Sequence, residues 1–306
     1  MKTSTVERGL EGYLAAARDR VDAVLEAWGE RGAALWPAPV AAAVRYSLLG
    51  PGKRLRPTLV FAACEAVGGG APATAEIAAA VEVVHAYSLV HDDLPCMDDD
   101  DLRRGRPTTH RAFDVGTATR AGFHMVALAA RVLARGMERL GLSPQRRQAV
   151  ALELFRAAGA GGMIGGQWLD LEAEGRAIPI PALEEVHRRK TGALIAASCV
   201  IGGLAAGDAV PPPHLEALRA YGQAIGLAFQ IADDVLDATA TSAQLGKTAG
   251  KDAARAKSTF ATLLGVGPAR VEAGRLAALA VARLRDAGLV SPTLMELAHY
   301  IVTRSH

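Results

Sequence analysis

The residues best suited to chemistry are carboxylates gathered at the end of one apolar segment. Asp92 and Asp93 close a helix-like run, and Asp98–Asp101 follow after a break at Pro95. Proline excludes a regular continuation of the helix, so we expect residues 94–97 to bulge and return Asp98 toward the pair. Several hard oxygen ligands at one point suit Mg²⁺, which also prefers water and phosphate oxygens. Taken alone, such a run of acids is more often a solvated loop or helix end than a metal site.

A second acidic cluster lies in the otherwise apolar segment 229–237. Asp233 and Asp237 are four residues apart, so they share one helical face, and Asp234 lies beside them. Carboxylates in such a helix must face a cavity, a metal or water, because burying them unpaired is costly. The absence of Glu-x-x-His pairs argues against a di-iron centre. Oxygen-only ligands favour Mg²⁺ bound together with a phosphorylated substrate.

Basic residues occur in separate segments that could face these acids. The glycine- and proline-rich loop 50–57 carries Lys53 and Arg56 just before a helix, where backbone N–H groups can also hold phosphate. Further positive charges follow at Lys190 (beside Thr191), Lys247 and Lys257. Each of these alone is more often a solvated side chain, so their significance depends on the fold bringing them together.

The elements that must position these residues are predicted to be helices. Apolar residues recur with helical spacing along most of the chain, aromatic residues are scarce, and alternating strand patterns are not seen. No linker, repeat or composition shift divides the sequence, so we expect one all-α domain over residues 1–306. The helices are predicted at about 5–30, 38–49, 57–68, 73–93, 115–140, 144–173, 180–206, 212–237, 254–263, 267–287 and 291–303.

Composition excludes several classes of protein. The 306 residues carry a formal net charge of +2, so no overall field indicates a nucleic-acid or membrane partner. The longest uncharged run, residues 191–207, falls short of the roughly 20 residues that cross a bilayer and contains several glycines, which favours a buried core helix. Three cysteines without metal-ligand spacing, together with the lack of an apolar signal segment, predict a cytoplasmic protein.

Seven ordered blocks cover nearly the whole chain: RYSLLGPGKRLRP, HAYSLVHDDLPCMDDDDLRRGRPTTH, GGMIGGQWLDLEAEG, HRRKTGALI, GLAFQIADDVLD, LGKTAGKD and KSTF. Together they resemble the trans-isoprenyl diphosphate synthases (polyprenyl synthetases), with bacterial short-chain farnesyl diphosphate synthases nearest. The resemblance implies an isoprenoid-synthase-type bundle of roughly ten or more helices around a central cavity, and a homodimer. It also implies head-to-tail condensation of an allylic diphosphate, dimethylallyl or geranyl, with isopentenyl diphosphate.

The resemblance further assigns roles to individual residues. It implies Mg²⁺, three ions with substrate bound, bridging the allylic diphosphate to both acidic clusters. The expected ligands are Asp92, Asp98 and Asp233, while Asp93, Asp234 and Asp237 orient waters or neighbouring groups. The allylic diphosphate is assigned to Arg103, Lys190, Thr191, Gln230, Lys247 and Lys257. Isopentenyl diphosphate is assigned to Lys53, Arg56, His85 and Arg104.

Product length is expected to depend on the segment before the first acids. Tyr87 lies five residues before Asp92, roughly 7.5 Å along a helix, and Ser88 lies on the same helical face as Asp92. In the resembled family an aromatic residue here accompanies C15 products and a small one accompanies C20. Tyr87 is therefore predicted to floor the pocket and stop growth at farnesyl diphosphate, although a plain core role and a C20 product are alternatives.

Two departures from the family pattern leave another alternative open. Phe123 stands where the family has an acid, and Trp168 is bulkier than the usual residue. A weakly active chain, or a non-catalytic partner subunit of a prenyl synthase, would tolerate such changes. A class I terpene cyclase is the rival within the same fold, but the aspartates of 233–237 and the basic loop disfavour it.

Overall fold

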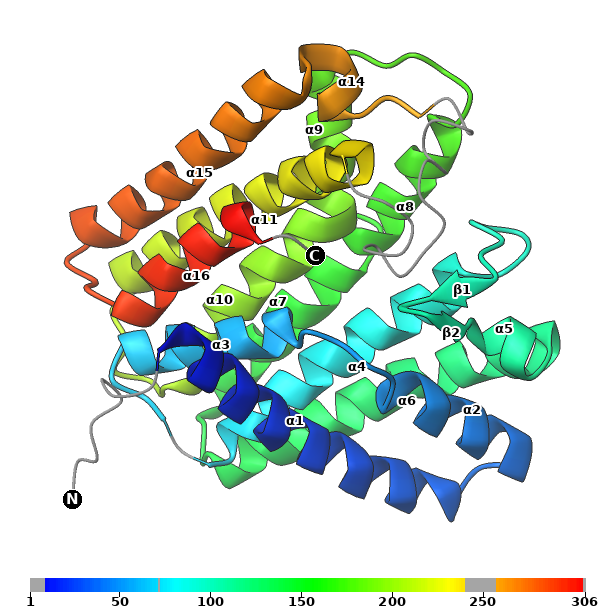
Figure 1. Cartoon of the computed structure of the whole chain (residues 1–306). Helices are drawn as coiled ribbons and strands as arrows, with labels where there is room; N and C mark the ends of the chain where they lie inside the picture. Colours follow the sequence, from blue (N-terminus) through cyan, green and yellow to red (C-terminus); the bar gives the residue numbers. More distant parts are fainter. Residues whose placement is uncertain (1–8, 71, 240–256, 305–306) are drawn as a thin grey trace.

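A computed structural model describes residues 9–70, 72–239 and 257–304 (Figure 1). Within these ranges the chain is almost entirely helical, which confirms the all-α prediction. The helices are α1 (Leu10–Ala33), α2 (Ala38–Leu48), α3 (Leu55–Ala66), α4 (Thr74–Asp92), α5 (Thr109–Ala112), α6 (Val115–Arg139), α7 (Pro144–Ala158), α8 (Met163–Glu172), α9 (Ile180–His187), α10 (Ala193–Ala205), α11 (Pro212–Thr239), α14 (Phe260–Leu264), α15 (Val266–Asp286) and α16 (Pro292–Thr303).

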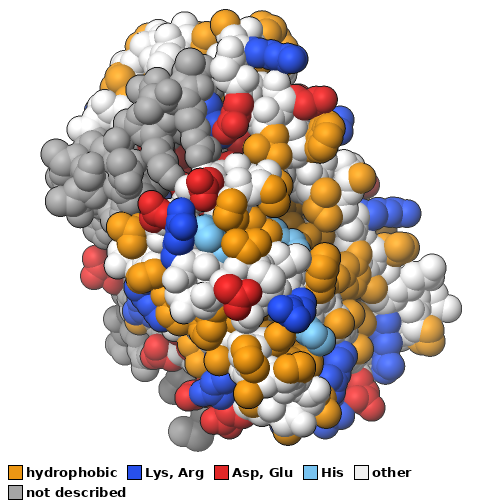
Figure 2. Space-filling model, turned by 90° about the vertical axis from the view of Figure 1, so that its right-hand side faces the viewer, with side chains coloured by type: hydrophobic (Ala, Val, Ile, Leu, Met, Phe, Trp, Pro, Cys, Tyr) orange, Lys and Arg blue, Asp and Glu red, His pale blue; other side chains and the backbone are white. Residues whose placement is uncertain are grey.

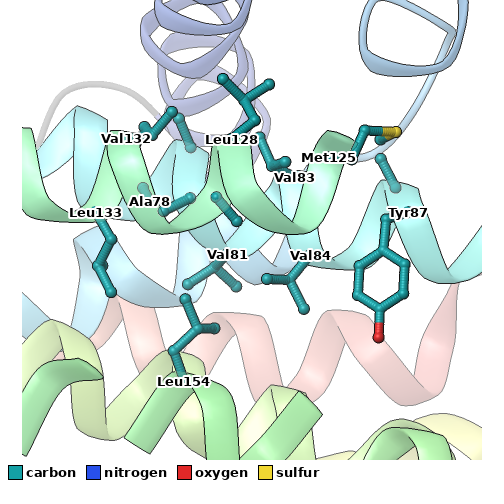
Figure 3. Close-up of a cluster of buried hydrophobic side chains, with 14 of the residues drawn as sticks. Ala78, Val81, Val83, Val84, Tyr87, Met125, Leu128, Val132, Leu133 and Leu154 are labelled. Carbon is teal, nitrogen blue, oxygen red and sulfur yellow. The ribbon is translucent and has the colours of Figure 1, made fainter. Parts of the chain in front are cut away.

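Helices α4 and α10 lie at the centre because they are apolar nearly all round. Most residues of α4 are buried, and every residue of α10 except Ala193 is buried. Helix α4 packs against α6 and α3, and α10 packs between α3 and α11 (Figure 1). Figure 3 shows α4 beside α6, with Val83 of α4 next to Leu128 of α6 and Val81 pointing toward Leu154 of α7. Asp233, near the carboxyl end of α11, lies close to the basic residues Lys53 and Arg56.

The longest uncharged run of the sequence forms the buried helix α10, as predicted. No helix among the described residues is long and apolar enough to cross a membrane. The three cysteines, Cys64, Cys96 and Cys199, are all unbonded to one another.

Three local features differ from the sequence prediction. The helix predicted over 144–173 is broken at Gly159–Gly162, where a Cβ on Gly162 would lie 2.1 Å from the Ala157 carbonyl oxygen. The helix predicted over 180–206 contains a π-helical turn, η2 (Arg188–Gly192). A two-stranded hairpin, β1 (Leu102–Arg103) and β2 (Arg106–Pro107), and the short α5 were not predicted. All three lie at the candidate site or beside it.

Candidate active site

The first acidic cluster folds back on the end of α4, as the sequence predicts. The Asp98 amide donates to the Asp92 carbonyl at 2.8 Å, and the Asp100 amide donates to the Asp93 carbonyl at 3.3 Å. Asp99 takes a left-handed backbone with φ of 44°, a conformation that aspartate tolerates better than most residues. The turn after α4 therefore returns Asp98 to Asp92.

Asp93 has a different task from its neighbour, because it holds an arginine of the hairpin. Arg103 donates from Nε to the Asp93 carboxylate at 2.7 Å and from Nη2 to the same oxygen at 2.6 Å. Asp100 receives a second, longer contact from Arg103 at 3.2 Å. A carboxylate that accepts both nitrogens fixes the guanidinium plane. In this arrangement Asp93 orients Arg103; its role in the reaction stays a prediction.

The Asp92 carboxylate lies in a site that favours a bound cation. Burial raises the pKa of Asp92 to about 7, and Asp98 and Asp93 add to this against the opposing charges of Lys190 and Arg103. A crowded, partly desolvated carboxylate of this kind is stabilised in its charged form by a cation. No three acidic, histidine or cysteine side chains among the described residues are close enough to hold an ion by themselves. The donor set fits Mg²⁺ that completes its shell with water and substrate oxygens.

Two lysines from distant parts of the chain meet on Asp170 of α8. Lys190 donates to Asp170 Oδ2 at 2.6 Å and Lys257 donates to the same oxygen at 3.0 Å. Burial on its own raises the pKa of Asp170, but the two ammonium groups bring it down to about 2. Because this pKa lies below the ordinary value, the stabilisation is complete above about pH 4 and is lost only as pH falls toward 2.

Close backbone contacts place Lys190 in the site. It belongs to η2, and a Cβ on Gly166 would lie 2.1 Å from the Lys190 amide nitrogen. On the other side, a Cβ on Gly226 of α11 would lie 2.8 Å from Gly192 Cα. Because Gly166 and Gly226 have no Cβ, the backbones of α8 and α11 can pack directly against η2. A π turn interrupts the regular hydrogen bonding of a helix, which is why such turns recur at functional sites.

The second acidic cluster divides its three carboxylates between different tasks. Asp234 is buried, and it accepts from the Phe260 amide at 2.8 Å and contacts His187 Nε2 at 3.3 Å. Asp233 is partly exposed and forms an ion pair with Arg304, whose guanidinium stacks 3.8 Å above the Phe229 ring. Asp237 follows one turn later and is partly exposed. Asp234 thus supports the α11–α14 junction, while Asp233 is oriented to the basic side of the site.

The residues predicted to hold isopentenyl diphosphate form a cationic cluster next to Asp233. Burial lowers the pKa of Arg56 to about 10, and the charge of Arg104 adds to this. Burial, followed by the charges of Arg56 and Arg104, holds the pKa of His85 well below its usual range, so His85 is neutral at pH 7. Partial burial lowers the pKa of Lys53, and Arg304 adds to the effect. Such crowding of cations is relieved by a bound anion.

The loop that carries Lys53 and Arg56 is anchored by a buried arginine. Arg54 has a left-handed backbone with φ of 49°, and its guanidinium donates to Glu82 and Asp22, both at 2.8 Å. It also donates to the carbonyls of Leu48 and Gly50. Arg54 therefore turns inward so that its two basic neighbours can face the site.

Replacing Arg54 with Ala should lower the free energy of unfolding by about 3–5 kcal/mol, because Glu82 would remain buried without its charge partner. Urea denaturation of the variant and the parent measures this difference. Arg135→Ala removes an exposed ion pair with Glu138 and serves as the control, for which the unfolding midpoint should not move. Equal midpoints for all three proteins would contradict the anchoring role.

Comparison with known proteins agrees with this geometry. The sequence model of the family described as polyprenyl synthetase matches residues 37–286. This chain belongs to the polyprenyl synthetase family. It is a prenyltransferase, and the isoprenyl synthase fold predicted from the sequence is confirmed.

Relatives within the polyprenyl synthetase family differ in product. Farnesyl diphosphate synthase of Escherichia coli is 45% identical over 270 residues, which are 87% of this chain and 90% of that protein. The chloroplastic heterodimeric geranylgeranyl pyrophosphate synthase large subunit 1 of Arabidopsis thaliana is 42% identical, covering 88% and 73%. Geranyltransferase of Helicobacter pylori complexed with magnesium and isoprenyl diphosphate superposes with a TM-score of 0.81 at 28% identity, covering 98% of each chain.

The structure brings most of the predicted site residues of this polyprenyl synthetase together. Thr191 is buried in η2, and Gln230 is partly buried on α11, one turn before Asp233 and Asp234. Tyr87 is buried on α4, and the hydroxyl of Ser88 donates to the His85 carbonyl at 2.8 Å. Lys247 lies outside the described residues.

Three residues of the site were missed by the sequence analysis. Asp170 joins the two lysines, and Arg304 pairs with Asp233 near the end of the chain. Gln167 is buried one turn before Asp170, and neither of its amide side-chain atoms has a hydrogen-bond partner among the described residues. A polar signal existed for two of them, because Gln167 and Asp170 interrupt the apolar block GGQWLDL.

Proposed function

We propose that the protein is a Mg²⁺-dependent farnesyl diphosphate synthase that condenses dimethylallyl or geranyl diphosphate with isopentenyl diphosphate. One observation carries this proposal: the cations fall into two groups. Lys190 and Lys257 converge on Asp170 beside the first acidic cluster, whereas Arg56 and Arg104 crowd around His85, with Lys53 near Arg104. Two separate anion sites suit a reaction with two diphosphate substrates.

The allylic substrate is assigned to the side that carries Asp92, Asp98 and Asp233. Magnesium ions, three by family resemblance, would neutralise the charge that grows on the departing diphosphate. Arg103, oriented by Asp93, and the two lysines on Asp170 would hold the same diphosphate by charge-assisted hydrogen bonds. Donors that are already fixed in place stabilise the leaving group without reorganisation when the C–O bond ionises. Lys247 is assigned to this group from the sequence alone.

The allylic cation needs electron-rich groups and protection from water. Thr191 and the backbone carbonyls of η2 lie on one side of α11, and Gln230 lies on α11 itself. We assign these dipoles, with the amide of Gln167, to shielding the cation. The double bond of isopentenyl diphosphate then attacks, forming the new C–C bond, and a proton leaves the adjacent carbon. Because the pKa of His85 is held well below its usual range, its imidazole is a weak base, and the released diphosphate is proposed to accept the proton.

Tyr87 is proposed to set the product at C15. Burial raises the pKa of its phenol, and the charge of Asp92 adds to this, so Tyr87 lies close enough to Asp92 to feel its charge. Figure 3 shows the Tyr87 ring beside Val84, at the end of the apolar cluster nearest the carboxyl end of α4. A ring in this position would meet the tail of a growing product.

Replacing Tyr87 with Ala should convert the main product from C15 to C20, because the shortened side chain opens the floor of the pocket. The measurement is chromatography of the dephosphorylated products from geranyl and isopentenyl diphosphate. Tyr87→Phe keeps the ring and should retain C15. A C15 product from the alanine variant would contradict the proposed role of Tyr87. A C20 product from the parent protein would contradict the proposal that the protein makes farnesyl diphosphate.

We also propose that residues 1–306 form one domain and that two copies associate. Large apolar side chains are exposed on successive helices that pack against one another: Val115, Phe123 and Val126 on α6, Leu152 and Phe155 on α7, and Ile164 and Trp168 on α8. Figure 2, which looks onto the side with α5 and the hairpin, shows hydrophobic side chains gathered across the middle of the view. Such a surface favours burial against a second copy.

Replacing Trp168 with Glu should convert a dimer into a monomer, because a charge would be buried in the contact. Light scattering after size-exclusion chromatography gives the mass of each species. Val290→Glu changes another exposed apolar residue on a different part of the chain and should leave the dimer intact. A parent protein that elutes with the mass of one chain would contradict the proposed assembly.

A further inference from the structure

Three aromatic rings form a row from the interior of the bundle to the surface of α6. The Tyr87 ring meets the His91 ring edge to face, with centroids 5.8 Å apart and planes at 86°. His91 meets the Phe123 ring in the same manner, at 5.5 Å and 83°. Tyr87 is 7% exposed and Phe123 is 65% exposed. The row connects the proposed floor of the product pocket with the outside of the molecule.

The middle ring of the row is closely confined. His91 Nε2 lies 3.2 Å from the Thr119 carbonyl oxygen, which requires the ring to donate its proton from Nε2. A Cβ added to Gly122 would lie 1.9 Å from the same nitrogen, so the ring rests directly on the backbone of α6. His91 therefore has no room to move toward α6, and Phe123 covers it from the solvent side.

The position of His91 restricts Tyr87 in turn. The two residues are four apart on α4, and helical side chains lean toward the amino-terminal end, so the later ring lies over the earlier one. The His91 ring fills the space between Tyr87 and α6. Without the His91 ring, the Tyr87 side chain can adopt a second rotamer. The position of the Tyr87 ring beside the apolar cluster of Figure 3 is then no longer fixed.

We propose that His91 is a positioning residue that limits product length by fixing the Tyr87 ring, and that Phe123 holds His91 from the surface. The inference rests on the proposed function, because it requires that Tyr87 sets the length of the product. Phe123, which departs from the family pattern, would then affect the length of the product and not the acidic site. The chemical step itself is left to other residues.

The test compares C20 to C15 product ratios from geranyl and isopentenyl diphosphate with Mg²⁺. Phe123→Ala and His91→Gln each remove one aromatic contact, and each should raise the ratio about fivefold, the size of effect expected from one aromatic pair. His91→Phe keeps a ring beside Tyr87 and should restore a ratio close to that of the parent. Val126→Ala, an exposed change one turn further along α6, is the matched control and should not alter the ratio.

Tyr87→Ala, measured in parallel, separates this inference from the proposed function. If Tyr87→Ala lengthens the product while Phe123→Ala and His91→Gln match the parent, the positioning role is wrong and the proposed function stands. If Tyr87→Ala itself leaves the product unchanged, Tyr87 does not set product length, and the positioning role of His91 is contradicted together with it. Because Phe123 lies on the proposed contact surface and not in the core of the chain, its alanine variant gives an answer even where a change at His91 impairs folding.

Discussion

Replacing Asp92 with Asn should lower kcat for the condensation by about 10³-fold, because one charged oxygen ligand and its electrostatic stabilisation of the leaving diphosphate are lost together. Asp92 is the acid whose pKa burial raises most clearly, to about 7, so its charged form depends on a bound cation. The variant should therefore also bind Mg²⁺ and geranyl diphosphate together more weakly. Steady-state kinetics over a range of Mg²⁺ concentrations measures both effects.

The neighbouring acid Asp101 provides the matched control. Its carboxylate is exposed and pairs with Arg111 at 2.6 Å, away from Asp92. Asp101→Asn keeps the length of the acidic run and removes one charge, so it should retain nearly full activity. An Asp92→Asn variant with the activity of the parent would show that this carboxylate does not hold the metal. Equal losses in both variants would show that only the overall negative charge matters.

Replacing Asp170 with Asn should lower kcat/KM for geranyl diphosphate by about 10²-fold, since a group that orients others beside a metal site has effects of this size. Lys190 and Lys257 both donate to Asp170 Oδ2, and a neutral amide would leave the two ammonium groups repelling each other. The main change should appear in KM for the allylic substrate, because its diphosphate is the proposed partner of both lysines. KM for isopentenyl diphosphate should change little.

Glu174→Gln tests whether the position of the charge matters. Glu174 contacts Lys257 alone of these two lysines, at 3.4 Å, so the loss of its charge should have a much smaller effect. The two variants carry the same change in net charge. Equal KM values for geranyl diphosphate in Asp170→Asn and the parent would remove Asp170 from the proposed site.

The sequence predicted those features that local patterns determine. Proline at position 95 excluded a straight helix, and the structure returns Asp98 to Asp92 as expected. Helical periodicity was sufficient for α4 and α11, and it placed Asp92 at the end of α4 and the second acidic cluster on α11. The resemblance to the polyprenyl synthetases was confirmed across most of the chain. The roles of single residues, by contrast, remain proposals.

The features that were missed depend on contacts between distant segments. Lys257 and Asp170 are 87 residues apart, so no spacing rule could pair them. The hairpin strands have two residues each, too few for an alternating pattern, and Gly105 with a φ of 75° closes the turn between them. The apolar pattern of the sequence continues through Gly159–Gly162, so it did not predict the break between α7 and α8. Glycine permits both helical and non-helical backbone, and the close backbone contact at Gly162 is visible only in the structure.

The reaction of the purified parent protein tests the proposed pair of diphosphate sites most directly. The protein is incubated with geranyl diphosphate and isotope-labelled isopentenyl diphosphate, with Mg²⁺ or with excess chelator, and the products are identified by mass. We predict farnesyl diphosphate and one pyrophosphate for each labelled molecule consumed, with no product in chelator. A hydrocarbon that lacks the label, or no consumption of labelled substrate with Mg²⁺ present, would contradict the claim.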